Sequence, residues 1–322
     1  MTPRVGLIGA RRHRQGLGPF VARDLKAAGA TVPCLLGTRS ETVELAEQQL
    51  FEQAGIRVRG YTRLEEMLGR EDLDALAILS PAETHESYLC TVAEAGLHVF
   101  CEKPLVWAGR ALLDRARRRA EAFRVRGLLL SENCQWPYAL EAFRVLHPGT
   151  LDGPPRSFSM RLSPASRGVQ LLGDCLPHPL SILQALAPGR RPIIENARYA
   201  LLTGDMANLG VAFDYRADGV RVHTEVELRS GARDPRPASL EIDGRRAERR
   251  VRLPSYDIAF SDGDRSVPVA DPLTARVGAF VADLEAVMAG APPPDPTPIV
   301  DRMAMLESLV EAYRIQVDDL DL

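Results

Sequence analysis

The sequence predicts an α/β protein with two domains: an N-terminal parallel sheet with covering helices, and a C-terminal α+β domain with a large, mostly antiparallel sheet. In roughly the first 130 residues, short apolar runs alternate with amphipathic stretches, as in βαβ units. After about residue 150, partly alternating runs are separated by turn residues, which is typical of antiparallel hairpins. The 322 residues are enough to bury two cores.

The N-terminal domain is predicted over residues 1–130. Its strands are expected to be nearly pure apolar runs, because helices cover both faces of such a sheet. We expect these strands at Arg4–Gly9, Thr31–Gly37, Ala75–Leu79, His98–Cys101 and Gly127–Ser131. We expect helices at Phe20–Ala28, Glu41–Gln53, Leu64–Leu68, Thr84–Ala95 and Ala108–Phe123.

The second domain is predicted over residues 131–296. Its expected strands are Arg156–Leu162, Ala197–Leu202, Val211–Tyr215, Val220–Leu228 and Ala238–Ile242, with turns at Asp218-Gly219 and Asp243-Gly244. A proline-rich linker at 291–296 precedes a predicted helix of about residues 297–316. That helix must bury an apolar face, and the N-terminal domain is one candidate surface for it.

Composition excludes several classes of protein. The net charge of -3 gives no reason to expect a nucleic-acid partner, and no apolar run is long enough to span a membrane. The five scattered cysteines indicate reduced thiols rather than a disulfide framework, and no cluster of residues has metal-ligand spacing. We therefore expect a cytoplasmic protein that acts on a small molecule without a metal.

The first predicted strand runs into a glycine-rich turn. Such a turn at the start of a parallel sheet is where dinucleotides bind, because glycines let backbone N–H groups approach a phosphate. The usual G-x-G-x-x-G spacing is absent, and the turn is longer by several residues. An ordinary glycine-rich turn with solvated arginines is the alternative. The candidate cofactor-binding residues here are Gly9, Ala10, Arg11, Arg12, Gly16 and Gly18.

The end of the second predicted strand bears on the choice of cofactor. NAD-binding sheets carry an acidic residue there, which accepts hydrogen bonds from the ribose. This chain has Thr38, Arg39 and Ser40 instead. A guanidinium and hydroxyls suit a 2′-phosphate, so NADP is predicted ahead of NAD.

The segments Ser80-Pro81, His85 and Glu102-Lys103-Pro104 follow the third and fourth predicted strands. With the glycine-rich turn, the change to an antiparallel second domain and a later Asp-x-x-x-His, they resemble the glucose-fructose oxidoreductase / inositol dehydrogenase (Gfo/Idh/MocA) family. The resemblance covers most of the chain, and its motifs are dense at residues 73–105 and 173–183. It implies an N-terminal Rossmann domain, a cis Lys103-Pro104 bond and cofactor contacts at Ser80, Pro81, His85, Glu102 and Lys103.

Lys103 is predicted at the carboxyl end of a strand, where ligands bind in open α/β sheets. Moving a hydride to or from a carbon requires a proton to move on the attached oxygen or nitrogen. A positioned cation can polarise that atom and share its proton. The resemblance therefore implies that Lys103 is a catalytic residue.

Asp174 and His178 resemble the family's second catalytic segment. On a helix, this spacing of four residues puts both side chains on one face. The resemblance implies that His178 exchanges a proton with the substrate and that Asp174 orients the substrate or the imidazole. Prolines on both sides of His178 indicate a helix start instead, with Asp174 as an N-cap beside a structural histidine.

The remaining candidates are substrate-binding residues. Trp136 and Tyr138 are interpreted either as a pocket wall or as core residues, and Arg161 either as an anchor for an anionic substrate or as a surface residue. The leading prediction is an NADP-dependent oxidoreductase acting on a hydroxyl or carbonyl carbon of a sugar- or cyclitol-like substrate. The alternatives are a reductase of imines or conjugated double bonds and a catalytically silent NADP-sensing regulator. By resemblance alone, a homodimer or homotetramer is expected.

Overall fold

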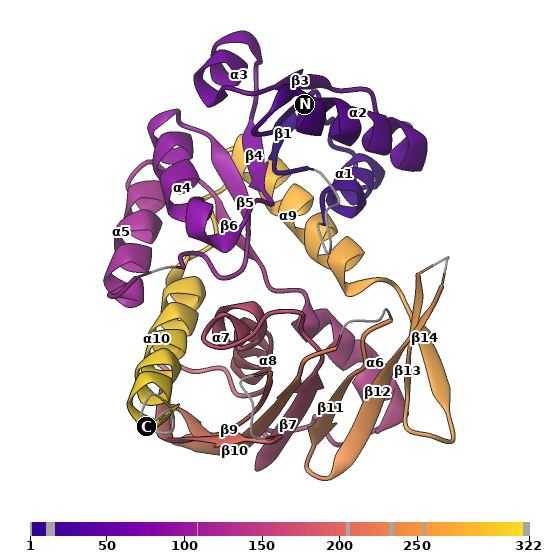
Figure 1. Cartoon of the computed structure of the whole chain (residues 1–322), viewed down its shortest axis with the longest axis vertical. Coiled ribbons are helices and arrows are strands. Elements are labelled where there is room, and N and C mark those ends of the chain that lie inside the picture. The colour runs from indigo at the N-terminus through magenta and orange to yellow at the C-terminus, as the bar shows by residue number, and fades with distance from the viewer. Residues whose placement is uncertain are drawn as a thin grey trace. The chain divides into compact units, whose positions relative to one another are not determined.

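The chain forms two compact units in the computed structural model, which describes residues 2–10, 17–107, 109–203, 207–231, 235–253 and 256–317. Unit 1 comprises Met1–Asn133 and Leu273–Val300, and unit 2 comprises Cys134–Pro272 and Asp301–Leu322. Figure 1 labels the elements of both units. Within the described residues, no helix is both long and apolar enough to cross a membrane.

Unit 1 contains a six-stranded sheet in the order β3-β2-β1-β4-β5-β6, and every pair of neighbouring strands is parallel. This confirms the predicted parallel sheet. Every residue of β1, β2 and β4 is buried, because helices cover both faces. The strands are β1 (Val5–Ile8), β2 (Cys34–Leu36), β3 (Arg59–Tyr61), β4 (Ala75–Ile78), β5 (His98–Glu102) and β6 (Leu130–Asn133).

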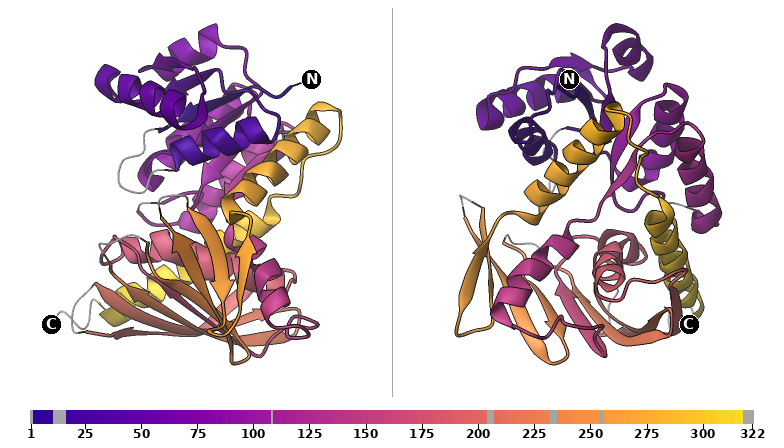
Figure 2. Two further views of the ribbon diagram at one scale, coloured as in Figure 1. Left: turned by 90° about the vertical axis from the view of Figure 1, so that its right-hand side faces the viewer. Right: turned by 180° about the vertical axis from the view of Figure 1, so that it is seen from behind.

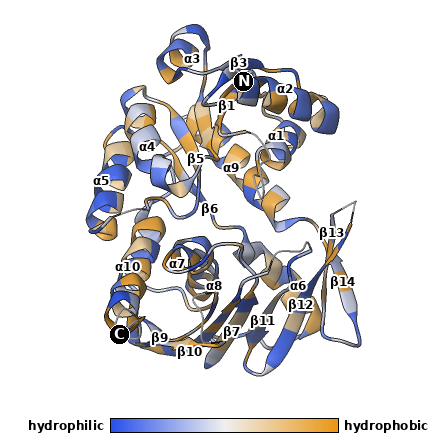
Figure 3. Ribbon diagram, viewed as in Figure 1, coloured by the Kyte–Doolittle hydropathy of each residue, from blue (hydrophilic) through white to orange (hydrophobic). Residues whose placement is uncertain are grey.

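The helices of unit 1 are α1 (Gly18–Ala27), α2 (Ser40–Ala54), α3 (Leu64–Arg70), η1 (a 3₁₀ turn at Ala82–Thr84), α4 (His85–Glu94), α5 (Leu112–Arg124) and α9 (Pro272–Met288). Helices α4 and α5 lie on one side of the sheet, and α1, α2 and α9 lie on the other (Figure 1). Figure 3 shows that α9 is more apolar than α5, and a smaller share of the residues of α9 is exposed.

Helix α9 contributes a row of apolar residues to the core of unit 1. These residues pack with α1, α2 and the parallel strands, and they are Leu273, Val277, Phe280, Val281 and Leu284. The rings of Phe280 and Phe100 are 5.1 Å apart. This helix was not predicted from the sequence; the predicted C-terminal helix was the candidate for packing on this domain.

The last helix, α10 (Thr297–Val317), contacts unit 2. The Tyr199 hydroxyl donates to the Leu309 carbonyl at 2.6 Å, and the Gln316 amide donates to the Ala197 carbonyl at 2.8 Å. Its predicted apolar positions are buried: Met303, Leu306, Leu309 and Val310. The helix itself is therefore as predicted, but from Asp301 onward it belongs to unit 2 rather than to the N-terminal domain.

Unit 2 contains an eight-stranded sheet in the order β14-β13-β12-β11-β7-β10-β9-β8. Its pairs are antiparallel except for β7 with β10, as the mostly antiparallel prediction required. The predicted turns at Asp218-Gly219 and Asp243-Gly244 join hairpins, and all four residues have positive φ. The strands are β7 (Ser157–Leu162), β8 (Ile193–Leu201), β9 (Asn208–Ala217), β10 (Val220–Arg229), β11 (Ala238–Ile242), β12 (Arg245–Arg252), β13 (Asp257–Ser261) and β14 (Ser266–Val269).

Only one face of this sheet carries helices among the described residues. The short helices are η2 (a 3₁₀ turn at Trp136–Ala139), α6 (Leu140–Leu146), α7 (Gln170–Cys175) and α8 (Pro177–Leu186). Helices α7, α8 and α10 lie over the same face of the sheet (Figure 2). The opposite face, which we call the open face, is lined by polar side chains.

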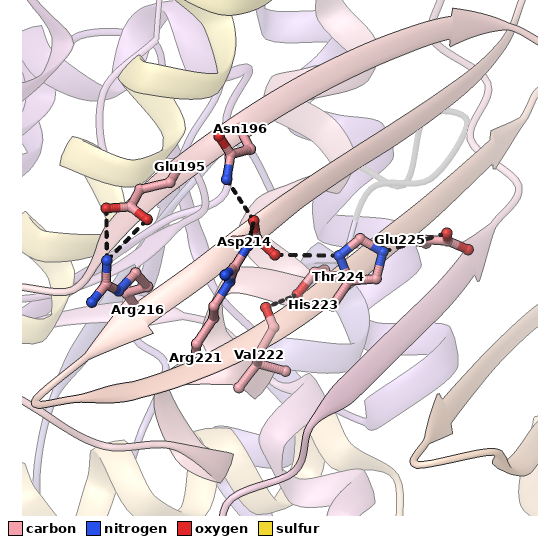
Figure 4. Close-up of polar contacts among 9 residues, drawn as sticks. All are labelled: Glu195, Asn196, Asp214, Arg216, Arg221, Val222, His223, Thr224 and Glu225. Carbon is pink, nitrogen blue, oxygen red and sulfur yellow. Dashed lines mark hydrogen bonds and ion pairs between the residues drawn. The ribbon is translucent and has the colours of Figure 1, made fainter.

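A polar cluster occupies the open face where β8, β9 and β10 run side by side (Figure 4). Asp214 accepts hydrogen bonds from Asn196 at 2.8 Å and Arg221 at 2.6 Å, and its other oxygen is 3.3 Å from His223 Nδ1. The hydrogen bonds from Arg221 and Asn196 lower the pKa of the Asp214 carboxyl. This carboxylate is therefore held in its charged form although it is nearly buried.

Candidate active site

In unit 1 the candidate residues lie at the carboxyl edge of the parallel sheet. Strands β2, β1, β4 and β5 are consecutive neighbours in the sheet, so their carboxyl ends meet at one edge. The chain leaves these strands at Gly37, Gly9, Leu79 and Lys103, respectively. The predicted cofactor and proton-transfer residues of the N-terminal domain follow directly from this edge.

Gly9 and Gly18 are required by close backbone packing. Gly9 has φ +81°, and a Cβ there would lie 2.8 Å from backbone atoms of Ser80. A Cβ on Gly18 would lie 1.9 Å from the carbonyl oxygen of Ala10, which is itself buried. The two glycines therefore let the turn after β1 pack against the turn after β4 and against the start of α1. The predicted residues Arg11, Arg12 and Gly16 lie outside the described residues.

Thr38, Arg39 and Ser40 are all exposed at the end of β2. The backbone N–H of Arg39 donates to Thr42 Oγ1 at 3.1 Å, which caps the start of α2. This contact engages the backbone of Arg39 and not its guanidinium. The edge therefore presents a cation and two hydroxyl groups at the place where an NAD-binding sheet carries a carboxylate.

Lys103 follows the last residue of β5, and the Lys103-Pro104 bond is cis, as the family resemblance implied. Lys103 is half-buried. The Leu105 N–H donates to Glu132 Oε1 at 2.8 Å, and the Asn133 amide donates to Glu102 Oε1. The polar end of β6 thus fixes the turn that carries Lys103.

Glu102 has an unusual electrostatic environment. Burial raises the pKa of its carboxyl, while the neighbouring Lys103 and the hydrogen bond from Asn133 oppose that shift. Glu132 adds a second carboxyl group that raises the pKa of Glu102 further. The two carboxyl groups and the ammonium of Lys103 therefore form one electrostatically coupled group.

The imidazole of His85 connects two turns of the edge. Its Nδ1 is 2.9 Å from the Pro104 carbonyl and its Nε2 is 2.9 Å from the Ser80 carbonyl. The ring is 1% exposed, and this burial lowers the pKa of His85. Both ring nitrogens therefore contact backbone carbonyls of the protein, and the contact of His85 with a cofactor stays a prediction.

Sequence reasoning missed three residues that support this edge. Glu132 and Asn133 are buried, and the guanidinium of Arg276 donates to the Glu132 carbonyl at 3.0 Å and to Ser131 Oγ. A usable signal for the first two was present, since Ser131, Glu132 and Asn133 end an otherwise apolar run with polar residues. No comparable signal marked Arg276, because its helix was not predicted.

In unit 2, Asp174 and His178 lie on either side of a helix junction. Asp174 is exposed near the end of α7, and His178 is half-buried in the first turn of α8. The junction forms because Pro177 and Pro179 lack backbone N–H groups. The predicted helix start at His178 is therefore confirmed, but the alternative role of Asp174 as its N-cap is wrong, because Leu176 holds that position.

Trp136 packs against His178, with ring centroids 6.1 Å apart. The Arg249 guanidinium lies 5.4 Å from the Trp136 ring, and Phe260 meets that ring edge-on. Trp136 is buried, whereas Tyr138 is 39% exposed. Trp136 therefore belongs to the core of unit 2 and also borders the candidate histidine, and the pocket wall formed with Tyr138 stays a prediction.

Arg161 does not join this group. Along β7 the buried residues Phe158, Met160 and Leu162 alternate with half-buried ones, and Arg161 points to the open face with the latter. It forms an ion pair with Glu227 at 2.9 Å. Alternation along the strand directs Arg161 away from α7 and α8, which favours the surface role, and its role as an anchor for an anionic substrate stays a prediction.

The N-terminal part of the chain is similar in sequence to known oxidoreductases. Residues 3–133 match the family model described as "Oxidoreductase family, NAD-binding Rossmann fold". The chain is 31% identical over 130 residues to 1,5-anhydro-D-fructose reductase of Ensifer adhaerens, a match covering 40% of this chain and 35% of the relative. It is 36% identical over 174 residues to dTDP-3,4-didehydro-2,6-dideoxy-alpha-D-glucose 3-reductase of Actinomadura kijaniata, covering 51% of this chain and 47% of the relative.

These matches span about a third to a half of the relatives' length. Similarity of fold extends further. A 3-ketoreductase from Actinomadura kijaniata, solved with NADP, aligns with a TM-score of 0.66 at 23% identity over 97% of this chain and 98% of that chain. UDP-N-acetylglucosamine 3-dehydrogenase from Acidithiobacillus ferrooxidans aligns with a TM-score of 0.66 at 20% identity over 97% of this chain and 98% of that chain.

The family match begins next to β1 and ends with β6, so it covers all six parallel strands and the turns that carry Gly9, Ser80 and Lys103. The sequence motifs, the strand order and the match therefore agree on the same part of the molecule. Residues 3–133 thus match the NAD-binding Rossmann domain of the Gfo/Idh/MocA oxidoreductase family.

Proposed function

We propose that this protein is a cytoplasmic NADP-dependent oxidoreductase that interconverts a hydroxyl and a carbonyl group on a small polar substrate of the sugar or cyclitol type. The observation that carries the proposal is the placement of Lys103 directly after β5, at the edge that also bears Gly9 and Ser80. The names of the matched relatives, a reductase of anhydrofructose and a reductase of a keto-deoxysugar nucleotide, support this substrate class.

The described residues fit a phosphate-bearing dinucleotide. Gly9 and Gly18 permit the close backbone packing of a dinucleotide turn, and α1 begins at Gly18. Arg39, with the hydroxyls of Thr38 and Ser40, would hold a 2′-phosphate. Ser80 and Pro81, at the end of β4, would border the nicotinamide end. When bound, the nicotinamide supplies or accepts the hydride.

The chain's own residues would move the proton that accompanies this hydride. Lys103 would polarise the substrate oxygen and share its proton, and His178 would exchange a proton with the same oxygen. Asp174 would orient the substrate or the imidazole. Trp136 and Tyr138 would form an apolar wall of the substrate pocket. The pairing of Lys103 with His178 stays a prediction.

The first test separates catalysis from binding. Purified protein is titrated with NADPH by fluorescence and then assayed for NADPH oxidation with a panel of keto-sugars, ketocyclitols and imines. Lys103→Met is expected to lower kcat by about 10²–10⁴-fold, the usual contribution of a positioned proton-transfer group, with little effect on NADPH binding. Lys26→Met is the matched control, since among the described residues Lys26 Nζ bonds to the main-chain carbonyls of Ala54 and Gly55, at 3.2 and 3.4 Å.

Each outcome of this assay decides between the candidate functions. Turnover of keto-sugars or ketocyclitols that is lost in Lys103→Met supports the proposal. Turnover of imines alone replaces it with the imine reductase alternative. NADPH binding without turnover, together with association with another protein, would instead support the catalytically silent NADP-sensing regulator.

The choice of NADP over NAD has its own test. Arg39→Ala is expected to weaken NADPH binding by about 10- to 100-fold, because a hydrogen bond to a charged group contributes about 1.5–3 kcal/mol. NADH binding should change little. Equal weakening of both cofactors would overturn the preference for NADP.

We further propose that two or four copies associate through the open face of the eight-stranded sheet. This face offers a broad polar surface, and the commonest homo-oligomers are two-fold dimers in which the same surface patch of both copies pairs with itself. Light scattering after size-exclusion chromatography should give two or four times the 35.3 kDa of one chain. A monomer at micromolar concentration would refute the association.

A further inference from the structure

We propose that His85 is a positioning residue that holds the Lys103 turn in place through a hydrogen bond from Nδ1 to the Pro104 carbonyl. As far as it concerns reaction rate, this inference rests on the proposed function. The imidazole belongs to the first residue of α4, and it bridges the turns that follow two adjacent strands, β4 and β5. Its task is therefore internal to the protein.

The single proton of a neutral imidazole can face only one of two carbonyl oxygens. Both neighbours of the imidazole are carbonyl oxygens at 2.9 Å, and a neutral imidazole has a single N–H to donate. Two features disfavour a second proton: the ring is buried, and it lies at the N-terminus of α4, where the helix dipole is positive. The two carbonyl oxygens and Glu132 favour this second proton and Lys103 disfavours it, but burial has the largest effect, and the net result is a lowered pKa of His85.

Solvent access indicates which carbonyl receives the proton. The contact with Pro104 is fully buried, whereas the contact with Ser80 is only partly buried. A carbonyl that water can reach loses little when its protein donor is absent, but a buried one bears the whole desolvation penalty. The single proton therefore belongs on Nδ1, facing Pro104.

A second bond on the same turn makes this contact consequential. The Leu105 N–H donates to Glu132 Oε1 at 2.8 Å, so the turn is held at Pro104 by His85 and at Leu105 by Glu132. Lys103 is the residue directly before these two anchor points. Loss of either anchor lets the backbone that carries the ammonium shift, and a misplacement of about 1 Å can cost about 100-fold in rate.

Two substitutions of similar size separate the two ring nitrogens. In His85→Asn, the amide nitrogen takes the place of Nδ1, whereas in His85→Gln it takes the place of Nε2. We expect His85→Gln to lower kcat by about 10- to 100-fold, with little change in the KM for NADPH. His85→Asn should recover most of this loss. His85→Leu, which has no donor, should behave like His85→Gln.

Hydrogen exchange of the Leu105 amide provides a readout that needs no substrate. The amide should exchange faster in His85→Gln and His85→Leu than in the wild type, and at the wild-type rate in His85→Asn. His98→Asn is the matched control on β5, because His98 Nδ1 accepts the Leu129 N–H at 2.9 Å at the opposite end of that strand. It should change neither kcat nor the Leu105 exchange rate.

The outcomes distinguish this inference from the proposed function. If the wild type reduces no carbonyl compound, the proposed function fails, and exchange alone decides the role of His85. The inference is overturned if the Leu105 amide exchanges at the wild-type rate in both His85→Gln and His85→Leu. It is also overturned if this amide stays protected in His85→Gln but exchanges faster in His85→Asn. If His85→Leu does not fold, the Asn and Gln variants decide.

Discussion

The two sheets of this molecule distribute polar residues in opposite ways. In unit 1 the strands β1, β2 and β4 are buried throughout, so polar side chains lie where strands end. In unit 2, β10 alternates buried residues with exposed ones, and the exposed ones include Arg221, His223 and Glu225 on the open face. A sheet covered on both faces thus confines chemistry to its edge, whereas a sheet with one open face offers a broad surface for association.

The two sheets also differ in the partners that hold their polar side chains in place. At the edge of unit 1, His85 and Glu132 bond to backbone groups of the turns that they support. On the open face, charged side chains bond to one another across neighbouring strands, as Asp214 does with Arg221. We therefore expect substitutions in unit 1 to act through packing and backbone position, and those on the open face to act through charge.

The largest effect is expected from the core of unit 1. Phe280→Ala should destabilise the protein by about 3–5 kcal/mol, because it removes a fully buried ring that packs on Phe100. Urea denaturation followed by circular dichroism measures the change. Phe51→Ala is the control, since Phe51 is 47% exposed on α2 and should contribute much less. Similar losses for the two variants would contradict the assignment of α9 to this core.

Gly18→Ala should have the next largest effect, about 1–3 kcal/mol or more, because its Cβ would lie 1.9 Å from the Ala10 carbonyl oxygen and the backbone would have to move. Gly69→Ala is a matched control that should change the stability of the protein in the opposite direction. Gly69 is within α3 and has nothing within 4 Å of its Cβ position, so alanine should stabilise the helix by about 0.5–1 kcal/mol. Thermal unfolding of both variants tests the pair.

On the open face, Asp214→Asn should destabilise the protein by about 1–3 kcal/mol, because it weakens hydrogen bonds to a nearly buried charged group. The pKa of Asp214 in the folded protein is below its ordinary value of 3.8. Its stabilising contribution is therefore complete above that value and is lost as the pH falls below it. Stability measured from pH 7 down to pH 3 should fall less steeply in the variant, and an unchanged slope would count against this assignment.

The smallest effect is expected for Arg161→Ala, at about 0.2–1 kcal/mol, because both partners of its ion pair with Glu227 are 39% exposed. A double-mutant cycle with Glu227→Gln measures the coupling, which should weaken as salt is added. Arg161→Ala should also leave kcat unchanged. A large fall in kcat would instead support a role of Arg161 in binding the substrate.

The parallel sheet was largely predictable because apolar runs and turn residues are local signals. All five predicted strands of unit 1 correspond to β1, β2, β4, β5 and β6. Strand β3 was missed because Arg59 and Gly60 interrupt its apolar pattern. Helix α9 was missed as well, and its partner surface lies more than a hundred residues earlier in the chain, where no local pattern can reveal it.

The site was predictable where a motif fixes it and not where tertiary contacts do. The motif that contains Glu102, Lys103 and Pro104 indicated both the turn and its cis bond. The roles of His85 and Glu132 depend on bonds to residues 19 and 27 positions away, respectively. The direction of Arg161 depends on which face of β7 the helices cover, which the sequence of that strand does not specify.

Helix α9 also affects how the molecule can be divided. The stretch that matches the family ends at Asn133, but the folding unit that contains it is completed by Leu273–Val300, about 140 residues later. A fragment that stops at the end of the homologous stretch would leave Phe100 without Phe280, and Glu132 and Ser131 without Arg276. The limits of the family match and the limits of the compact unit therefore differ here, and a fragment that keeps the core of unit 1 would need both stretches of chain joined.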